Sequence, residues 1–151
     1  MYLSNKCQYA LRAVFELAKH HGERPMPIAK IAEAQAIPPR FLESILAELK
    51  RAGYLESRRG VEGGYLLAVS SKTLTVGEII RFIGGPLDPV KCIGDHAGKD
   101  CPLLGQCAFM GLWERARNAI ATVYDKTTFQ DLILEEQERA KAPRRASDYC
   151  I

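Results

Sequence analysis

The sequence lacks a long apolar run and is poor in histidine. No apolar run approaches the roughly 18 residues that a membrane-spanning helix needs, and the polar residues scattered through residues 1–21 are unlike a signal peptide. Three histidines, without a nucleophile–base arrangement or a phosphate-binding glycine loop, give little basis for catalysis. We therefore expect a cytoplasmic protein that is not an enzyme and has no membrane partner.

A strong charge of either sign is also absent. The net charge of +3 indicates no partner by itself. The first 72 residues, however, carry eleven lysines and arginines against seven acidic residues, and the remainder carry ten against eleven. A basic N-terminal half is compatible with nucleic acid. The hydrophobic content of 47% over 151 residues suffices for the core of one domain.

The five cysteines include none of the closely spaced pairs that are typical of zinc sites. Three of them, Cys92, Cys101 and Cys107, share the segment CIGDHAGKDCPLLGQC. Their odd total and the expected cytoplasmic location argue against a disulfide framework. The spacing alone fits unligated thiols about as well as a metal site.

The first half of the chain shows three helical patterns. A helix is expected from about Ser4 to His21, and a shorter one follows Pro27. After the break AIPPR, a third helix ends at Gly53 and carries the apolar stripe Phe41, Leu42, Ile45, Leu46 and Leu49. Two helices around a tight break, following another helix, predict a helix-turn-helix.

The stretch YLESRRGVEGGYLLAV then predicts a β-hairpin. Its glycines, Gly60, Gly63 and Gly64, allow the positive φ angles that such a turn needs. A hairpin directly after the helix-turn-helix is the wing of a winged helix. Its tip carries Arg58 and Arg59.

A long apolar helix follows the wing domain. Thr75 and Glu78 form a capping box at the start of a short helix, and the domain closes near Gly85. The later helix has a wide stripe that we expect to pack against a second copy of the chain: Phe109, Leu112, Trp113, Ala116, Ile120, Val123 and Tyr124.

These patterns predict a mainly α fold with a small β-hairpin wing, in which a winged helix-turn-helix domain is joined to a long C-terminal dimerisation helix. The expected parts are the DNA-binding domain over 1–85, a cysteine-containing loop over 86–107, a dimerisation helix and a C-terminal helix over 108–140, and a disordered tail over 141–151.

Five pieces of the chain resemble, in the same order, the bacterial winged-helix regulators that include IscR, NsrR and CymR. They are LSNKCQYALRAVFELA, FLESILAELKRAGYLESRRGVEGGYLLA, LTVGEII, the three cysteines and LWERARNAIATVYDKTTFQDLI. The resemblance covers residues 1 to about 140, and the wing phrase ending in GGYLLA is its most specific part. It implies a dimeric transcription regulator, and members with three cysteines generally hold a 2Fe–2S or 4Fe–4S cluster.

The chain departs from that family pattern at the fourth cluster ligand. IscR-like members have a histidine three residues after the third cysteine, where this chain has Met110. NsrR-like members use an aspartate near the N-terminus, where this chain has Gln8. The first cysteine gap is also longer than usual. The remaining candidates are His96, which we favour, Asp95, Gln8 and Cys7. Cys7 could instead pack as a small apolar residue of the first helix.

With the resemblance, an iron–sulfur cluster held by Cys92, Cys101 and Cys107 becomes the leading interpretation. Thiolates are soft ligands that suit iron, and the glycines of the loop let its backbone wrap around a cluster. Two alternatives stay open. Zinc could stabilise the loop, or the regulator could work without metal, through thiol oxidation or a partner protein, as CymR-like members work without a cluster.

The DNA-reading residues are expected at the start of the third helix, because a recognition helix enters the major groove by its N-terminal end. Arg40, Phe41, Glu43 and Ser44 would lie nearest the bases. The resemblance also implicates the position of Pro38, where a polar residue is usual. Phe41 fits the apolar stripe too, so a place in the core is the competing interpretation.

Other contacts would position the protein on double-stranded DNA. Arg58 or Arg59 at the wing tip could enter a narrow minor groove, and Lys6 and Tyr9 could touch phosphate and fix the register. The alternatives are solvated arginines, a surface lysine and a half-buried tyrosine. A twofold homodimer would require a palindromic operator.

Overall fold

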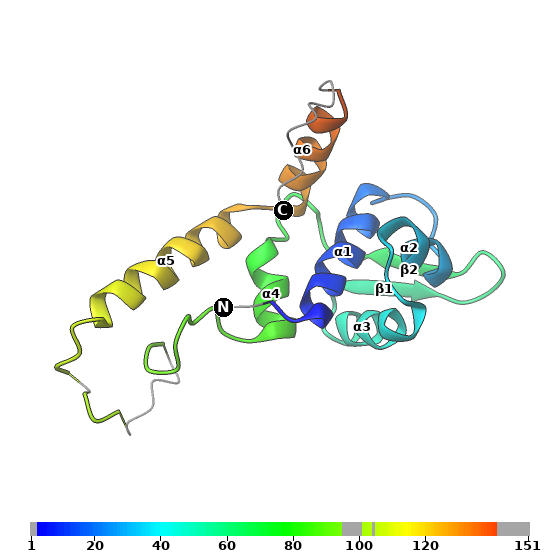
Figure 1. The fold of residues 1–151 in the computed structure, drawn as a ribbon. Coiled ribbons are helices and arrows are strands. Elements are labelled where there is room, and N and C mark those ends of the chain that lie inside the picture. Colours follow the sequence, from blue (N-terminus) through cyan, green and yellow to red (C-terminus); the bar gives the residue numbers. More distant parts are fainter. Residues whose placement is uncertain (1–2, 95–100, 104, 142–151) are drawn as a thin grey trace.

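The computed structural model describes residues 3–94, 101–103 and 105–141. Within these ranges it has six helices and a two-stranded antiparallel sheet (Figure 1). The elements are α1 (Asn5–Lys19), α2 (Ile28–Gln35), α3 (Pro39–Arg51), β1 (Leu55–Arg58), β2 (Gly64–Leu67), α4 (Val76–Gly84), α5 (Met110–Lys126) and α6 (Phe129–Lys141). None of the helices in the described ranges is long and apolar enough to cross a membrane.

Prolines and a left-handed turn delimit the helix-turn-helix. Pro27 and Pro38 occupy the N-cap positions of α2 and α3 with extended backbone, as residues with a fixed φ and no N–H readily do. Ala36 ends α2 with a φ of 48°, and the Ile37 N–H then donates to the Ala32 carbonyl at 2.9 Å. The predicted helix-turn-helix is confirmed.

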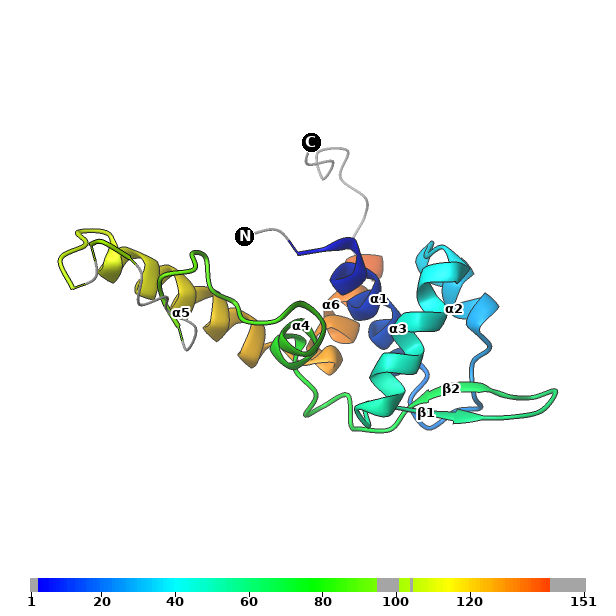
Figure 2. The ribbon, with the colours of Figure 1, turned by 90° about the horizontal axis from the view of Figure 1, so that it is seen from below.

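The wing is a hairpin that projects beyond the helices (Figure 2). Leu55 lies opposite Leu67, and both are buried. At the base of the wing, Met26 and Tyr65 exchange two backbone hydrogen bonds of 2.9 Å. Gly64 must be glycine here, because its φ is 155° and a Cβ atom would collide with the Met26 backbone. The predicted wing is therefore held by a third extended segment.

The core of the winged-helix domain includes α6, although the DNA-binding domain was predicted to end at Gly85. Phe129 is fully buried and Ile133 nearly so, in the same cluster as the buried side chains of α1, α2 and α3. Backbone hydrogen bonds fix the start of α6, with the Phe129 N–H donating to the Leu74 carbonyl at 3.1 Å. The side chains of α6 that pack on this core are confined to its first two turns: Phe129, Leu132 and Ile133. The rest of the helix is mostly polar, so the sequence indicates this packing only weakly.

Helix α5 differs from the other helices in its burial. None of its residues is buried in the part of the chain that the structure describes. It packs against α4 at one end and extends away from the rest of the molecule (Figure 1). Leu112 and Val123 expose 44% and 61% of their surface, and Phe109, just before the helix, exposes 59%. Residues 3–94, 101–103 and 105–141 of a single chain thus leave an apolar face of α5 uncovered.

Candidate DNA-binding surface and cysteine segment

The N-terminal end of α3 is exposed because the opposite face of the helix is anchored. Four buried aliphatic side chains hold α3 against the core. Arg40, Phe41, Glu43 and Ser44 lie on the outer face, with Pro38 just before the helix. Phe41 exposes 43% of its surface, so the alternative placement of Phe41 in the core is wrong. These residues are positioned as a recognition helix requires.

Aromatic rings and guanidinium groups form a continuous cluster at this end of α3. The Tyr9 and Phe41 ring centroids are 6.2 Å apart. The Arg40 guanidinium lies 4.6 Å from the Phe41 ring centroid, and the Arg12 guanidinium lies 6.0 Å from that of Tyr9. Cation–π contacts of this kind orient arginine side chains. Sequence reasoning missed Arg12, whose spacing of three residues from Tyr9 on one helix could have revealed it.

Lys6 is engaged within the protein. Its ammonium group lies 2.6 Å from a Glu48 carboxylate oxygen, which joins α1 to α3. The Lys6 side chain remains 47% exposed. A phosphate contact by Lys6 would therefore exchange one anionic partner for another.

The wing tip exposes Arg58 and Arg59, as a groove contact needs. A further guanidinium lies close by, because Arg24 of the α1–α2 segment pairs with Glu62 of the wing at 3.3 Å. Both partners are more than three-quarters exposed, so the pair adds little stability. The wing base is held instead by its backbone pairing with Met26.

The three cysteines of the predicted cluster are all half-buried. In the described part of the chain, no three histidine, cysteine, aspartate or glutamate side chains converge to hold a metal ion. Asp95 and His96, candidates for the fourth ligand, lie outside the described residues. Three thiols are a donor set that suits iron, but the described geometry does not bring them together.

Cys7 is buried, and it packs against Val76, Ile80 and Leu87. Burial raises the pKa of the Cys7 thiol. A thiol that resists ionisation is a poor metal ligand, so the interpretation of Cys7 as a small apolar residue fits better than a ligand role.

The start of the cysteine segment is anchored to the helical domain. Leu87 and Ile93 are buried on either side of Cys92. The Asp88 side chain is 16% exposed and lies 3.8 Å from the Arg117 guanidinium of α5. The position of Cys92 is therefore linked to α5 as well as to α4.

The residues predicted for the dimer interface divide into two groups. Phe109, Leu112 and Val123 are exposed, and the remaining four are half-buried: Trp113, Ala116, Ile120 and Tyr124. The Phe109 and Trp113 rings stack with centroids 6.1 Å apart. Tyr124 packs in part against the cluster that contains Val76 and Ile80 of its own chain. An intermolecular role for this stripe remains a prediction.

Residues 3–135 match the Rrf2 family model, described as an iron-dependent transcriptional regulator. The chain belongs to the Rrf2 family. It is 37% identical to the HTH-type transcriptional regulator CymR of Bacillus subtilis over 132 residues, which cover 87% of this chain and 89% of that protein. Both the resemblance and the role in transcription regulation that it implies are confirmed, and the family model and CymR are named as regulators, not as enzymes.

Solved Rrf2 structures confirm the winged-helix fold. The structure of CymR, the global cysteine regulator of B. subtilis, gives a TM-score of 0.74 at 36% identity and covers 89% of this chain and 98% of that one. The structure of T. potens IscR gives a TM-score of 0.71 at 31% identity and covers 99% of this chain and 97% of that one.

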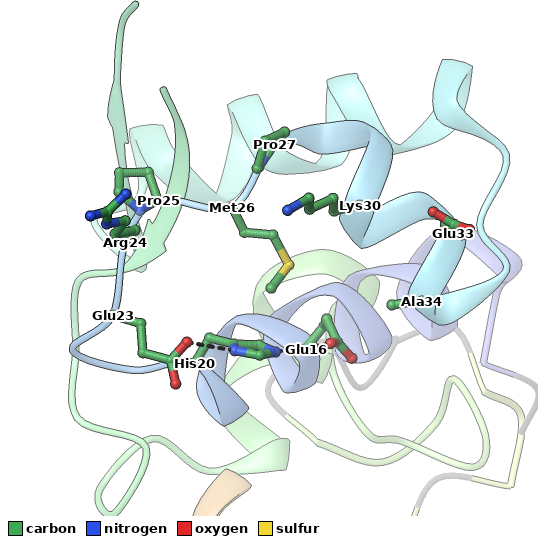
Figure 3. A pocket seen from close by; sticks show the side chains of 10 residues that line it. All are labelled: Glu16, His20, Glu23, Arg24, Pro25, Met26, Pro27, Lys30, Glu33 and Ala34. Carbon is green, nitrogen blue, oxygen red and sulfur yellow. Dashed lines mark hydrogen bonds and ion pairs between the residues drawn. The ribbon is translucent and has the colours of Figure 1, made fainter. Parts of the chain in front are cut away.

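This Rrf2 chain also has an open cavity of about 860 Å³ between the end of α1 and α2 (Figure 3). Its lining includes Glu16, His20, Glu23, Met26, Lys30 and Glu33. Glu16 is the one buried acidic side chain among the described residues. Its carboxylate accepts hydrogen bonds from Gln35 Nε2 at 2.6 Å and lies 2.9 Å from Lys19 Nζ. The buried charge is thus satisfied by protein groups that tie α1 to α2.

The charge network lowers the pKa of Glu16. Burial raises this pKa, but the hydrogen bonds from Lys19 and Gln35 and the attraction of Lys19 and His20 outweigh burial. A carboxyl group whose pKa is lowered on folding contributes stability above its unfolded value of about 4.3, and the contribution is lost as the pH falls through the folded value.

We expect Glu16→Gln to flatten the acid-induced fall in stability. The free energy of unfolding, measured by urea titration between about pH 6 and pH 3, should decline less steeply in this variant than in the wild type. Glu33→Gln, at an exposed position of the same cavity, serves as the control and should keep the wild-type slope. Parallel pH profiles for Glu16→Gln and the wild type would contradict this assignment.

Proposed function

We propose that the chain is a dimeric regulator that binds a palindromic operator through α3 and the wing. Its signal is read through the cysteine segment, by an iron–sulfur cluster on Cys92, Cys101 and Cys107. The observation that carries the DNA-binding part is the outward presentation of Arg40, Phe41 and Glu43 on a helix whose other face is fixed in the core.

The exposed side chains of α3 have complementary base-reading chemistry. Arg40 can pair with guanine, Glu43 can accept from the cytosine amino group, and the Phe41 ring can contact a thymine methyl group. The Ser44 hydroxyl already donates to the Phe41 carbonyl at 3.0 Å, which leaves its lone pairs as acceptors. Pro38 sets the start of the helix and has no N–H to offer to a phosphate.

Basic side chains outside α3 would supply position and affinity. Arg58 and Arg59 extend from the wing, where a guanidinium can enter a narrow minor groove. Tyr9 and Arg12 of α1 adjoin Phe41 through the aromatic cluster and can contact the phosphate backbone. Lys6 contributes less, because it must share its charge with Glu48.

The face of α5 that the described residues leave uncovered supports the proposed dimer. Burial of Leu112, Val123 and their neighbours against a second copy removes apolar surface from water. A twofold arrangement places two α3 helices on one face of the DNA, which requires a palindromic site.

A second candidate is a regulator of the same fold that senses through its thiols without metal. Two observations favour it. The cysteines do not converge in the described residues, and the chain is 37% identical to a CymR, a regulator whose solved structure is described as that of the global cysteine regulator of B. subtilis. The cluster is favoured by the three-cysteine set itself, because soft thiolates on a glycine-containing loop suit iron.

Removing Glu43 should relax base discrimination. For Glu43→Ala we expect the preference at one base pair of each half-site to fall by about 1–3 kcal/mol, while binding to unrelated DNA at the same salt concentration is retained. The measurement is fluorescence anisotropy on a selected palindrome and its single-base variants. Glu138→Ala, at an exposed position of α6, is the control. If both variants change the affinity for every single-base variant equally, Glu43 does not contact the bases.

The metal content separates the cluster from its rivals. In protein purified anaerobically, we expect iron and sulfide near cluster stoichiometry, with charge-transfer absorption that Cys101→Ser abolishes and Cys7→Ala preserves. Zinc in place of iron would make the segment a structural site. Absence of iron after anaerobic reconstitution would contradict the cluster and leave the thiols as the sensing groups.

A further inference from the structure

Helix α5 is attached to the winged-helix domain by a two-point ion pair. Arg81 of α4 donates from Nη1 to Asp125 Oδ1 at 2.5 Å and from Nη2 to Asp125 Oδ2 at 2.7 Å. This side-by-side geometry fixes the relative orientation of the two side chains as well as their separation, because a planar guanidinium and a planar carboxylate are joined by two parallel hydrogen bonds. The two residues are 44 positions apart in the sequence, so the pair joins separate elements.

Gly77 is the residue that makes room for this pair. It lies in α4 one turn before Arg81 and is itself buried. A Cβ atom at this position would collide with the Asp125 carboxylate and lie 3.0 Å from Arg81 Nη1. Gly77 is not one of the glycines with a positive φ in the described chain, so its backbone conformation does not require glycine. Alanine would be the better helix former, which makes the close approach of Asp125 the reason for glycine.

The pair lies where it can set the direction of α5. At the end of the helix, the Thr127 carbonyl accepts from the Val76 N–H at 2.9 Å, which fixes a pivot. Asp125 precedes this pivot by half a turn, and the next ion pair along α5, Arg117 with Asp88, is looser at 3.8 Å. Rotation of α5 about its pivot is therefore resisted by the Arg81–Asp125 pair together with the packing of Tyr124 against Val76 and Ile80.

The length of α5 amplifies any change of angle. Leu112 lies about 20 Å along the helix from Asp125, so a tilt of about 10° displaces it by about 3.5 Å. That displacement is close to the roughly 3.4 Å rise of one base pair along DNA. The angle between α5 and α4 would thus determine the distance between the two winged-helix domains of the proposed dimer. A change of about 10° would alter this distance by about the length of one base pair.

We propose that Arg81, Asp125 and Gly77 are positioning residues that set the half-site spacing of the operator. The proposal rests on the proposed function, since it needs a dimer formed through α5. The pair is 42% and 44% exposed at its two side chains, where an ion pair contributes little to stability. The Arg81 guanidinium lowers the pKa of Asp125, so the pair stays charged at neutral pH.

The test varies the spacer between two selected half-sites in steps of one base pair. The DNA affinity of the wild type is compared with that of three single variants, Gly77→Ala, Arg81→Ala and Asp125→Ala. A double variant exchanges the two charges, Arg81→Asp with Asp125→Arg. We expect each single variant to lose roughly three- to tenfold in affinity at the preferred spacer and less at neighbouring spacers. Affinity for a single half-site should not change, and the exchange should restore the preference.

Arg139→Ala is the matched control, because Arg139 pairs with Glu135 of the same helix and joins no two elements. If the single variants keep the wild-type ratios between spacers, the proposal is overturned although the dimeric function stands. A second outcome also overturns the proposal. If the variants lose affinity equally for every spacer and for a single half-site, and their free energy of unfolding falls, the pair has only a structural role. A wild type that binds two half-sites no better than one removes the proposed function first, and this inference with it.

Discussion

The apolar face of α5 has no cover within the described part of the chain, and this constraint governs the rest of the molecule. A helix without a buried residue gains little from its own domain. Exposed side chains such as Leu112 and Val123 can leave water only against another surface. In the proposed dimer a second copy would supply that surface, and a twofold axis through α5 would fix two recognition helices relative to one another. The proposed symmetry of the operator would then follow from the need to bury one helix face.

The segment from Pro86 to Thr128 leaves the winged-helix domain and returns to it. Its beginning is anchored by Leu87 and Ile93, and its end by Phe129, which fills the domain core. The three cysteines and α5 belong to this segment. Arg81 of α4 joins α5 to the domain through Asp125, and Asp88 joins the start of the segment to Arg117 of α5. In the proposed regulator, a chemical change at Cys92 could therefore shift α5 through the Asp88–Arg117 contact, and a shift of α5 would change the spacing of the two DNA-binding domains.

Local patterns predicted the parts of the fold that local interactions determine. The prolines before α2 and α3 gave the helix-turn-helix, and the glycines of the wing gave the hairpin. The predicted capping box of Thr75 with Glu78 is present. Interactions between distant residues were not predictable, such as Lys6 with Glu48 or Arg81 with Asp125. Phe41 could not be assigned either, because a residue at the edge of a stripe is buried or exposed according to what packs beside it. The predicted fourth ligand, His96, lies outside the described residues.

The mass of the free protein in solution tests the central claim most directly. Sedimentation equilibrium over a range of concentrations should give twice the chain mass of 16.8 kDa at every concentration that saturates operator DNA. The same measurement on Val123→Asp should give the single-chain mass, with helical content preserved. A wild type that sediments as one chain while it binds the palindrome fully would contradict the account.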